Sequence, residues 1–102
     1  MANGASRRGH QRERDLVNWL KGRDWWAMRS PASLGEVDVV AAKPGRLVFY
    51  EVKSTAAGPF HSFGPKDREE LRFVAELAGA EPILCWHPPR GERHFIPESA
   101  WP

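Results

Sequence analysis

The chain contains a single cysteine, Cys85, among its 102 residues. Neither an internal disulfide nor a cysteine-based zinc site can therefore form within it. Cys85 lies inside the apolar segment of residues 82–86, where we expect a buried thiol that packs as a small hydrophobic side chain. The scarcity of cysteine is typical of proteins from a reducing compartment, which predicts a cytoplasmic location in a cellular or viral setting.

Long hydrophobic runs and a strong charge imbalance are also absent. No apolar run is long enough to cross a bilayer, and the segment around Arg7 and Arg8 lacks the apolar core of a secretory signal. The net charge is only +2, so the overall balance does not identify a partner. With 41% hydrophobic and 27% charged residues and no internal repeat, the sequence predicts one globular domain with no membrane partner and no small-molecule cofactor.

The most informative pattern present is a pair of apolar runs that flank Pro44-Gly45, a turn signal that predicts an antiparallel hairpin. With this dipeptide at the centre of the turn, Asp38 lies directly opposite Glu51. Lys53 shares the face of Glu51, because side chains alternate along a strand. Two facing carboxylates favour a bound cation, and a hard divalent ion such as Mg²⁺ fits this ligand set.

Two alternatives to this metal site follow from the same residues. Pro-Gly suits type I and II turns, whereas two-residue hairpins favour the primed types, so a longer loop with a one-residue slip would separate Asp38 from Glu51. The second alternative is a hairpin end with ordinary solvated charges, because the spacing of Asp38, Glu51 and Lys53 is common by chance.

Glu13 belongs to an amphipathic helix predicted over residues 10–21, with Gly22 as its stop. The apolar stripe of this helix consists of Leu16, Val17 and Leu20, and Glu13 lies three, four and seven residues before them, on the inward face. A carboxylate there either lies at the rim of the core or points at a buried positive charge. We expect it to be a third ligand of the metal site.

The remaining patterns predict the order helix, three strands, helix, two strands. This order indicates an α/β fold, a single domain with a mixed central sheet flanked by two helices. Phe60 and Phe63 lie in a long loop that either forms a binding arm or tucks into the core. The predicted segments are a flexible basic arm at 1–9, a single domain at 10–102, strands at 25–29, 37–41, 46–52, 82–86 and 93–96, a loop at 54–65, and a helix at 66–78 with the apolar stripe Leu71, Val74, Leu77 and Ala78 and with Gly79 as its stop.

A glutamate on the first helix, then an aspartate, then Glu-x-Lys on adjoining strands resembles the PD-(D/E)XK nuclease superfamily, here with Val37-Asp38 in place of Pro-Asp. Within it, the chain is similar to the archaeal-type Holliday junction resolvases. The likeness lies in residues 9–16, in 29–33 leading to Asp38, in 51–55 and in 78–82. It implies a restriction-endonuclease-like αβββαβ(β) fold.

The resemblance also implies roles for individual residues. Glu13, Asp38 and Glu51 match the metal ligands, Lys53 the catalytic lysine, and Ser33 a loop serine needed for activity. The family is homodimeric and uses one or two Mg²⁺ ions per subunit, for which Mn²⁺ can substitute. Arg14 and Arg29 match positions that contact DNA in the family, and the basic residues predicted to bind DNA are Arg7, Arg8, Arg14, Arg29, Lys66 and Arg68.

The sequence therefore predicts a Mg²⁺-dependent endodeoxyribonuclease that resolves four-way junctions by paired symmetric nicks. Alternatives are a linear-duplex or mismatch nickase of the same superfamily and a non-catalytic DNA-binding adaptor. The complete acidic set argues against the adaptor, because carboxylates repel phosphate. A two-fold homodimer would supply the second site for the second nick, and its candidate interface residues are Phe73, Trp86, Phe95 and Trp101.

Overall fold

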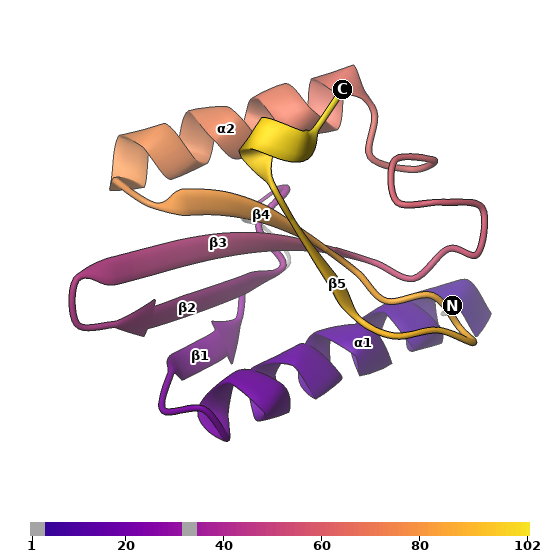
Figure 1. The fold of residues 1–102 in the computed structure, drawn as a ribbon, viewed down its shortest axis with the longest axis horizontal. Helices are drawn as coiled ribbons and strands as arrows, with labels where there is room; N and C mark the ends of the chain where they lie inside the picture. The colour runs from indigo at the N-terminus through magenta and orange to yellow at the C-terminus, as the bar shows by residue number, and fades with distance from the viewer. Residues whose placement is uncertain (1–3, 32–34) are drawn as a thin grey trace.

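The computed structural model describes residues 4–31 and 35–102. A five-stranded sheet lies between two helices (Figure 1). The elements are α1 (Gly4–Lys21), β1 (Trp26–Arg29), β2 (Val39–Lys43), β3 (Arg46–Lys53), α2 (Pro65–Ala78), β4 (Glu81–Trp86), β5 (His94–Pro97) and the short 3-10 helix η2 (Glu98–Ala100). The strands lie in sequence order, with β3 and β4 parallel and the other neighbours antiparallel. This arrangement confirms the predicted α/β fold with a mixed sheet.

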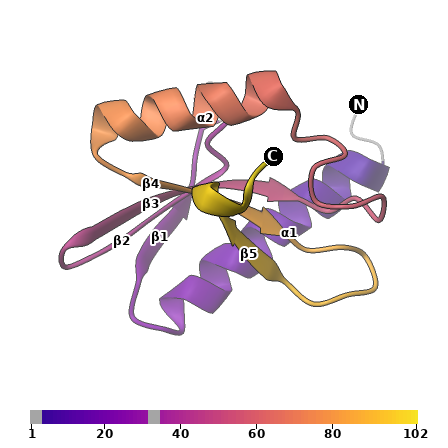
Figure 2. The same cartoon turned by 45° about the horizontal axis from the view of Figure 1, so that its top comes forward.

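The two helices cover opposite faces of the sheet, as Figures 1 and 2 show from two directions. Alternation along β4 sends Cys85 to the core under α1 and Leu84 to the core under α2. Leu16 and Leu20 of α1 are fully buried in the first core, which confirms the predicted stripe, and Cys85 is buried there as expected. Within the described ranges, no helix combines the length and hydrophobicity needed to span a bilayer.

The β2–β3 hairpin has the predicted register. Val39 pairs with Tyr50, and Lys43 pairs with Arg46 across a two-residue turn. Gly45 has a φ of 79°, the conformation that a type II turn requires after proline. The ladder ends at Val39, so the expectation that Asp38 pairs with Glu51 within it is wrong. Asp38 lies one residue before β2, and its side chain instead accepts a hydrogen bond from the backbone N–H of Val52 on β3.

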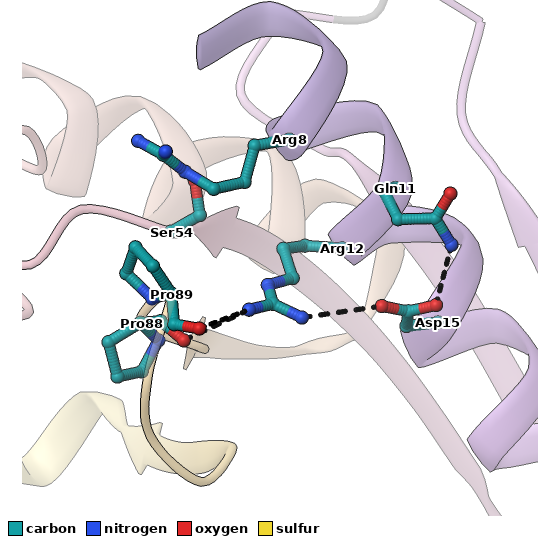
Figure 3. Close-up of polar contacts among 7 residues, drawn as sticks. All are labelled: Arg8, Gln11, Arg12, Asp15, Ser54, Pro88 and Pro89. Atoms are coloured by element: carbon teal, nitrogen blue, oxygen red, sulfur yellow. Dashed lines mark hydrogen bonds and ion pairs between the residues drawn. The ribbon is translucent and has the colours of Figure 1, made fainter. Parts of the chain in front are cut away.

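Helix α1 begins at Gly4, before the predicted start at residue 10, and includes residues 4–9 of the expected arm. Contacts with distant segments accompany this end of the helix. The Nε of Arg8 lies 3.4 Å from the Ser54 hydroxyl, and an Arg12 Nη donates to the Pro88 carbonyl at 3.0 Å (Figure 3). Such partners lie outside any local sequence window, which explains why helical periodicity alone did not predict this end.

Helix α2 starts with proline and ends at Gly79, whose φ of 70° confirms the predicted stop. Leu71 and Ala75 are its buried residues. Leu77 was predicted in the buried stripe but is 73% exposed. Two residues beyond Ala75, it points to the opposite side of the helix, because each residue advances the helix by about 100°.

Candidate active site

Glu51 is the only charged residue among the buried side chains of the described chain, with 4% of its surface exposed. It lies on the central strand β3, which is buried on both faces of the sheet. Its Oε1 is 3.3 Å from the ammonium nitrogen of Lys53, whereas its Oε2 is buried and has no hydrogen-bond partner among the described residues. An unpartnered buried carboxylate oxygen is costly, and a bound cation would compensate it.

Asp38 lies next to Glu51, one residue before β2. Its backbone N–H donates to the Tyr50 carbonyl, and its Oδ2 accepts the backbone N–H of Val52, both at 2.8 Å. The Asp38 carboxylate thus stands where a backbone carbonyl would continue the ladder. This hydrogen bond fixes the carboxylate at the edge of the hairpin, close to Glu51.

Burial raises the pKa of both carboxyl groups, and their effects on each other are unequal: a side-chain hydrogen bond with Glu51 lowers the pKa of Asp38, whereas the charge of Asp38 raises the pKa of Glu51. Burial is the main cause that raises the pKa of Asp38 to about 6, partly opposed by the hydrogen bond from Val52. Burial and then the charge of Asp38 raise the pKa of Glu51 to about 10. Two adjacent carboxyls with raised pKa values, here a buried one and a half-buried one, are a common arrangement at functional sites.

Glu13 approaches this region from α1, as the sequence predicted for its inward face. Its Oε1 accepts a hydrogen bond from the Nε of Arg29 at 3.0 Å, and its side chain is 16% exposed. Arg29, at the end of β1, is more open, with 37% of its side chain exposed. The ion pair brings a predicted metal ligand and a predicted DNA contact together.

A cavity of about 280 Å³ opens beside these side chains. The described residues that line it are His10, Glu13, Arg29, Ser30, Pro31, Gly35, Val37 and Asp38. His10 was not predicted as a site residue. Its position three residues before Glu13 on the same helix face is the signal that could have identified it. Ser33, the predicted loop serine, lies outside the described residues.

The donor set fits a hard divalent cation. Glu13 comes from α1, Asp38 from the segment before β2 and Glu51 from β3, and oxygen ligands of this kind suit Mg²⁺. The carboxylate oxygens of these three residues do not all lie within 4.8 Å of one another, a distance that Glu36, Asp67 and Glu70 meet among the described residues. The orphaned Oε2 of Glu51 and the raised pKa values of Glu51 and Asp38 are the observations that support a cation there. The roles of Glu13, Asp38, Glu51 and Lys53 in metal binding and catalysis stay predictions.

Glu36 is an acidic residue that was also not predicted from the sequence. Its side chain is close enough to Glu51 to contribute to the raised pKa of that carboxyl. Carboxylate oxygens of Glu36, Asp67 and Glu70 lie within 4.8 Å of one another. Glu70 is exposed, and exposed acidic groups of this kind are common without a bound ion.

The basic residues divide into exposed and engaged side chains. Arg8, Arg14 and Lys66 are exposed. Arg68 instead donates to the Phe63 carbonyl at 2.9 Å, and Arg12 holds backbone carbonyls of the β4–β5 loop. Nothing in the local sequence distinguishes these two uses of arginine, since the distinction depends on which carbonyls the fold brings nearby.

Comparisons with known proteins agree with this geometry. The family described as archaeal Holliday junction resolvase (Hjc) matches residues 4–100. The crystal structure of Archaeoglobus fulgidus Hjc, a Holliday junction resolvase from an archaeal hyperthermophile, is similar with a TM-score of 0.78 and 29% identity, over 88% of this chain and 72% of that chain.

Two curated relatives are similar in sequence. The crossover junction endodeoxyribonuclease Hjc of Methanocaldococcus jannaschii is 31% identical over 79 residues, which cover 78% of this chain and 58% of that protein. A UPF0102 protein of Granulibacter bethesdensis is 34% identical over 91 residues, which cover 85% of this chain and 54% of that protein. The chain thus spans little more than half the length of these relatives.

Proposed function

The chain belongs to the archaeal Holliday junction resolvase family, and on this basis we propose that it is a metal-dependent endodeoxyribonuclease that resolves four-way DNA junctions. The observation that supports the proposal best is the buried Glu51 beside the half-buried Asp38, with the Lys53 ammonium 3.3 Å from Glu51. A protein that only binds DNA would gain nothing from carboxylates at the site that meets the phosphates, because carboxylates repel phosphate.

Asp38, Glu51 and Glu13 would hold the cation. When bound, Mg²⁺ supplies Lewis acidity at the scissile phosphate and lowers the pKa of an attacking water. Asp38 is pre-oriented for this role by the N–H of Val52. The Oε2 of Glu51, which has no hydrogen-bond partner among the described residues, offers a second oxygen. Glu13 would have to leave its ion pair with Arg29 and move closer to join the other two ligands.

Lys53 supplies positive charge beside the reacting phosphate. Its side chain is 22% exposed, so its ammonium is paired with Glu51 yet remains accessible from solvent. A cation in this position stabilises the charge that develops on phosphate oxygens in the transition state. Arg29 contributes a further positive charge at the rim of the cavity.

Resolution of a four-way junction requires two cuts, whereas one subunit carries one such site. We therefore propose a two-fold dimer, in which the second site has the opposite strand polarity. Phe73 and Leu77 of α2 are 61% and 73% exposed and offer apolar surface for it. Trp101 was predicted to be an interface residue, but it packs in the core against Phe63.

The test is cleavage of a synthetic four-way junction in Mg²⁺ beside a linear duplex of the same arm sequence. We expect paired nicks in the junction and an intact duplex. Equal cleavage of both substrates would favour the nickase alternative. No cleavage of either, with the junction still bound, would favour the adaptor.

A further inference from the structure

A second pocket, of about 350 Å³, lies outside the carboxylate cavity. Its lining is Ala56, Trp86, Pro88, Pro89 and Arg90. Four of these side chains are apolar, and the fifth is a cation. The pocket is formed by the loop after β3 and by the β4–β5 loop, and the carboxylate pair does not contribute to it.

The register of the sheet brings this pocket next to Lys53. Trp86 is the partner of Lys53 on the parallel neighbour β4, so the two residues lie at the same edge of the sheet. Paired residues of parallel strands point to the same face and are separated by about 4.8 Å between strands. Trp86 is therefore the aromatic side chain beside the proposed catalytic lysine.

The walls of the pocket are held in position without a ligand. The indole N–H of Trp86 donates to the Thr55 carbonyl at 2.7 Å, and the ring stacks on His94 with centroids 5.2 Å apart. A wall fixed in advance loses little conformational entropy when a ligand binds.

Arg12 holds the opposite wall from α1 (Figure 3). It donates to the carbonyls of Pro88 and Pro89 at 3.0 and 3.5 Å. Asp15 lies 3.5 Å from the Arg12 guanidinium and accepts a hydrogen bond from Gln11. This network ties the two prolines to a helix rather than leaving them in a free loop.

The surroundings of the pocket match the chemistry of a nucleotide. A mainly apolar pocket lined by an indole suits a nucleobase, because the π face of any base can stack on an aromatic ring. Arg90 at the pocket and Arg8 beside Ser54 are exposed cations that suit the flanking phosphates. Glu92 is the acidic residue of the same loop and is exposed to solvent.

We propose that this pocket takes one nucleobase of the cut strand, splayed out of the stack at the branch point and held against Trp86. The inference rests on the proposed function, because it assumes that Lys53 acts on the neighbouring phosphate. It adds a reason for branch selectivity: a nucleotide at a branch point leaves the stack at lower cost than one in a continuous duplex.

The decisive experiment pairs two protein variants with an altered junction. Trp86→Leu removes the ring but keeps an apolar side chain, and Trp86→Phe keeps an aromatic face. Trp26→Leu is the control, since Trp26 is 58% exposed on the edge strand β1. Each protein is assayed on an intact junction and on one with an abasic nucleotide beside the cut.

On the intact junction, Trp86→Leu should reduce cleavage at subsaturating DNA about 10-fold or more, as expected for the loss of one stacked base. Cleavage by the wild-type protein should fall by a similar factor when the intact junction is replaced by the abasic junction. Trp86→Leu should lose little more there, because the partner base is already missing. Trp86→Phe and Trp26→Leu should stay within about 3-fold of wild type on the intact junction.

Equal losses from Trp86→Leu on both junctions would overturn the proposal. A Trp86→Leu protein that sediments at half the wild-type mass, with cleavage indifferent to the abasic nucleotide, would assign the pocket to a second copy of the chain instead.

A fluorescence measurement separates this inference from the proposed function. A single-stranded oligonucleotide with one 2-aminopurine should be quenched by wild-type protein and not by Trp86→Leu. Such quenching without junction cleavage would uphold the pocket and reject the resolvase proposal. Junction cleavage without Trp86-dependent quenching or abasic effect would uphold the resolvase and reject the pocket.

Discussion

At the scale of single residues, the protein places two carboxyl groups that are costly to ionise, those of Asp38 and Glu51, next to each other. Glu51 is 4% exposed, lies beside Asp38, and has one oxygen with no partner. The ammonium nitrogen of Lys53 lies 3.3 Å from the Oε1 of Glu51, but the pKa values of Asp38 and Glu51 remain raised. A fold that keeps Asp38 next to a carboxyl buried on its central strand has a use for the pair, and a divalent cation is the partner that fits their chemistry.

Asp38→Asn should reduce cleavage of a four-way junction at least 100-fold, because the variant keeps the shape of the side chain but loses the charge that holds Mg²⁺. Junction affinity should stay within a few-fold of wild type or rise slightly, since a charge that repels phosphate is lost. Single-turnover cleavage and a gel-shift assay in Ca²⁺ measure the two quantities. Wild-type rates in the variant would reject Asp38 as a ligand.

The stability of the metal-free protein should depend on pH with a definite sign. The pKa of Asp38 is raised from 3.8 to about 6 in the folded protein, so folding favours its protonated form. This stabilisation is fully present below pH 3.8 and is lost as the pH rises through about 6. Glu51, raised from 4.5 to about 10, extends the same loss to higher pH.

In EDTA, these two carboxyls should therefore make the unfolding temperature fall as the pH rises from 5 to 8. Thermal unfolding followed by circular dichroism measures the effect, and Asp38→Asn should flatten the curve. Added Mg²⁺ should raise the unfolding temperature more at pH 8 than at pH 5, since binding requires ionised ligands. A stability that is the same in the variant and wild type at both pH values would contradict the pKa shifts.

At the scale of elements, α1 does more than cover one face of the sheet. It contributes Glu13 to the cavity and uses Arg12 to hold the β4–β5 loop. The side chain of Arg12 is 18% exposed, and its Nε is buried without a partner. The arginines of α1 therefore have different tasks, and Arg12 is a structural residue.

Arg12→Leu should lower the free energy of unfolding by about 1 to 3 kcal/mol, because it leaves the Pro88 and Pro89 carbonyls without their donor. Arg14→Leu, on an exposed position of the same helix, is the matched control and should change it by less than about 0.5 kcal/mol. Urea denaturation measures both. Equal effects would show that the Arg12 contacts contribute no stability.

Arg14→Ala should instead act on DNA binding. Each phosphate contact that is lost reduces the slope of log affinity against log salt concentration by about 0.9. We expect this change for Arg14 and for Lys66, both exposed. Titrations of the four-way junction at several salt concentrations measure the slope, and an unchanged slope in Arg14→Ala would remove that residue from the DNA-binding surface.

At the scale of the whole molecule, the described part of one subunit carries one candidate active site, and α2 carries two exposed apolar side chains. Phe73 and Leu77 are both well exposed, and a shallow hollow beside them also borders Glu76. Isolated exposed apolar residues are ordinary, but two large ones side by side on a helix are typical of an interface. They are the interface residues that we propose for the dimer.

The dimer predicts an asymmetric product from mixed subunits. Wild-type chains mixed with Asp38→Asn chains should form heterodimers that nick only one strand of the junction. Phe73→Ser with Leu77→Ser should give a folded monomer whose paired nicks are lost, because both positions are exposed and do not support the core. Sedimentation velocity and denaturing gels of the cleaved strands report these results. Paired nicks by a monomer would reject the dimer.

The sequence by itself determined the elements and their order. Helical periodicity, the Pro44-Gly45 turn and the Gly79 stop each act over a few residues, so local reading predicted them, and the structure has the predicted β2–β3 register. The same reading brought Asp38, Glu51 and Lys53 to one end of one hairpin. Such features are encoded by neighbours along the chain.

Only the tertiary structure decided how these residues are held and what surrounds them. The backbone N–H of Val52 donates to Asp38, which lies outside the ladder. Arg29 of β1 pairs with Glu13, and Arg12 donates to a proline carbonyl of the β4–β5 loop. Burial between two helices, not composition, raised the carboxyl pKa values. These outcomes depend on which groups the fold brings within hydrogen-bond distance and how completely it excludes water, and a one-dimensional pattern carries neither quantity.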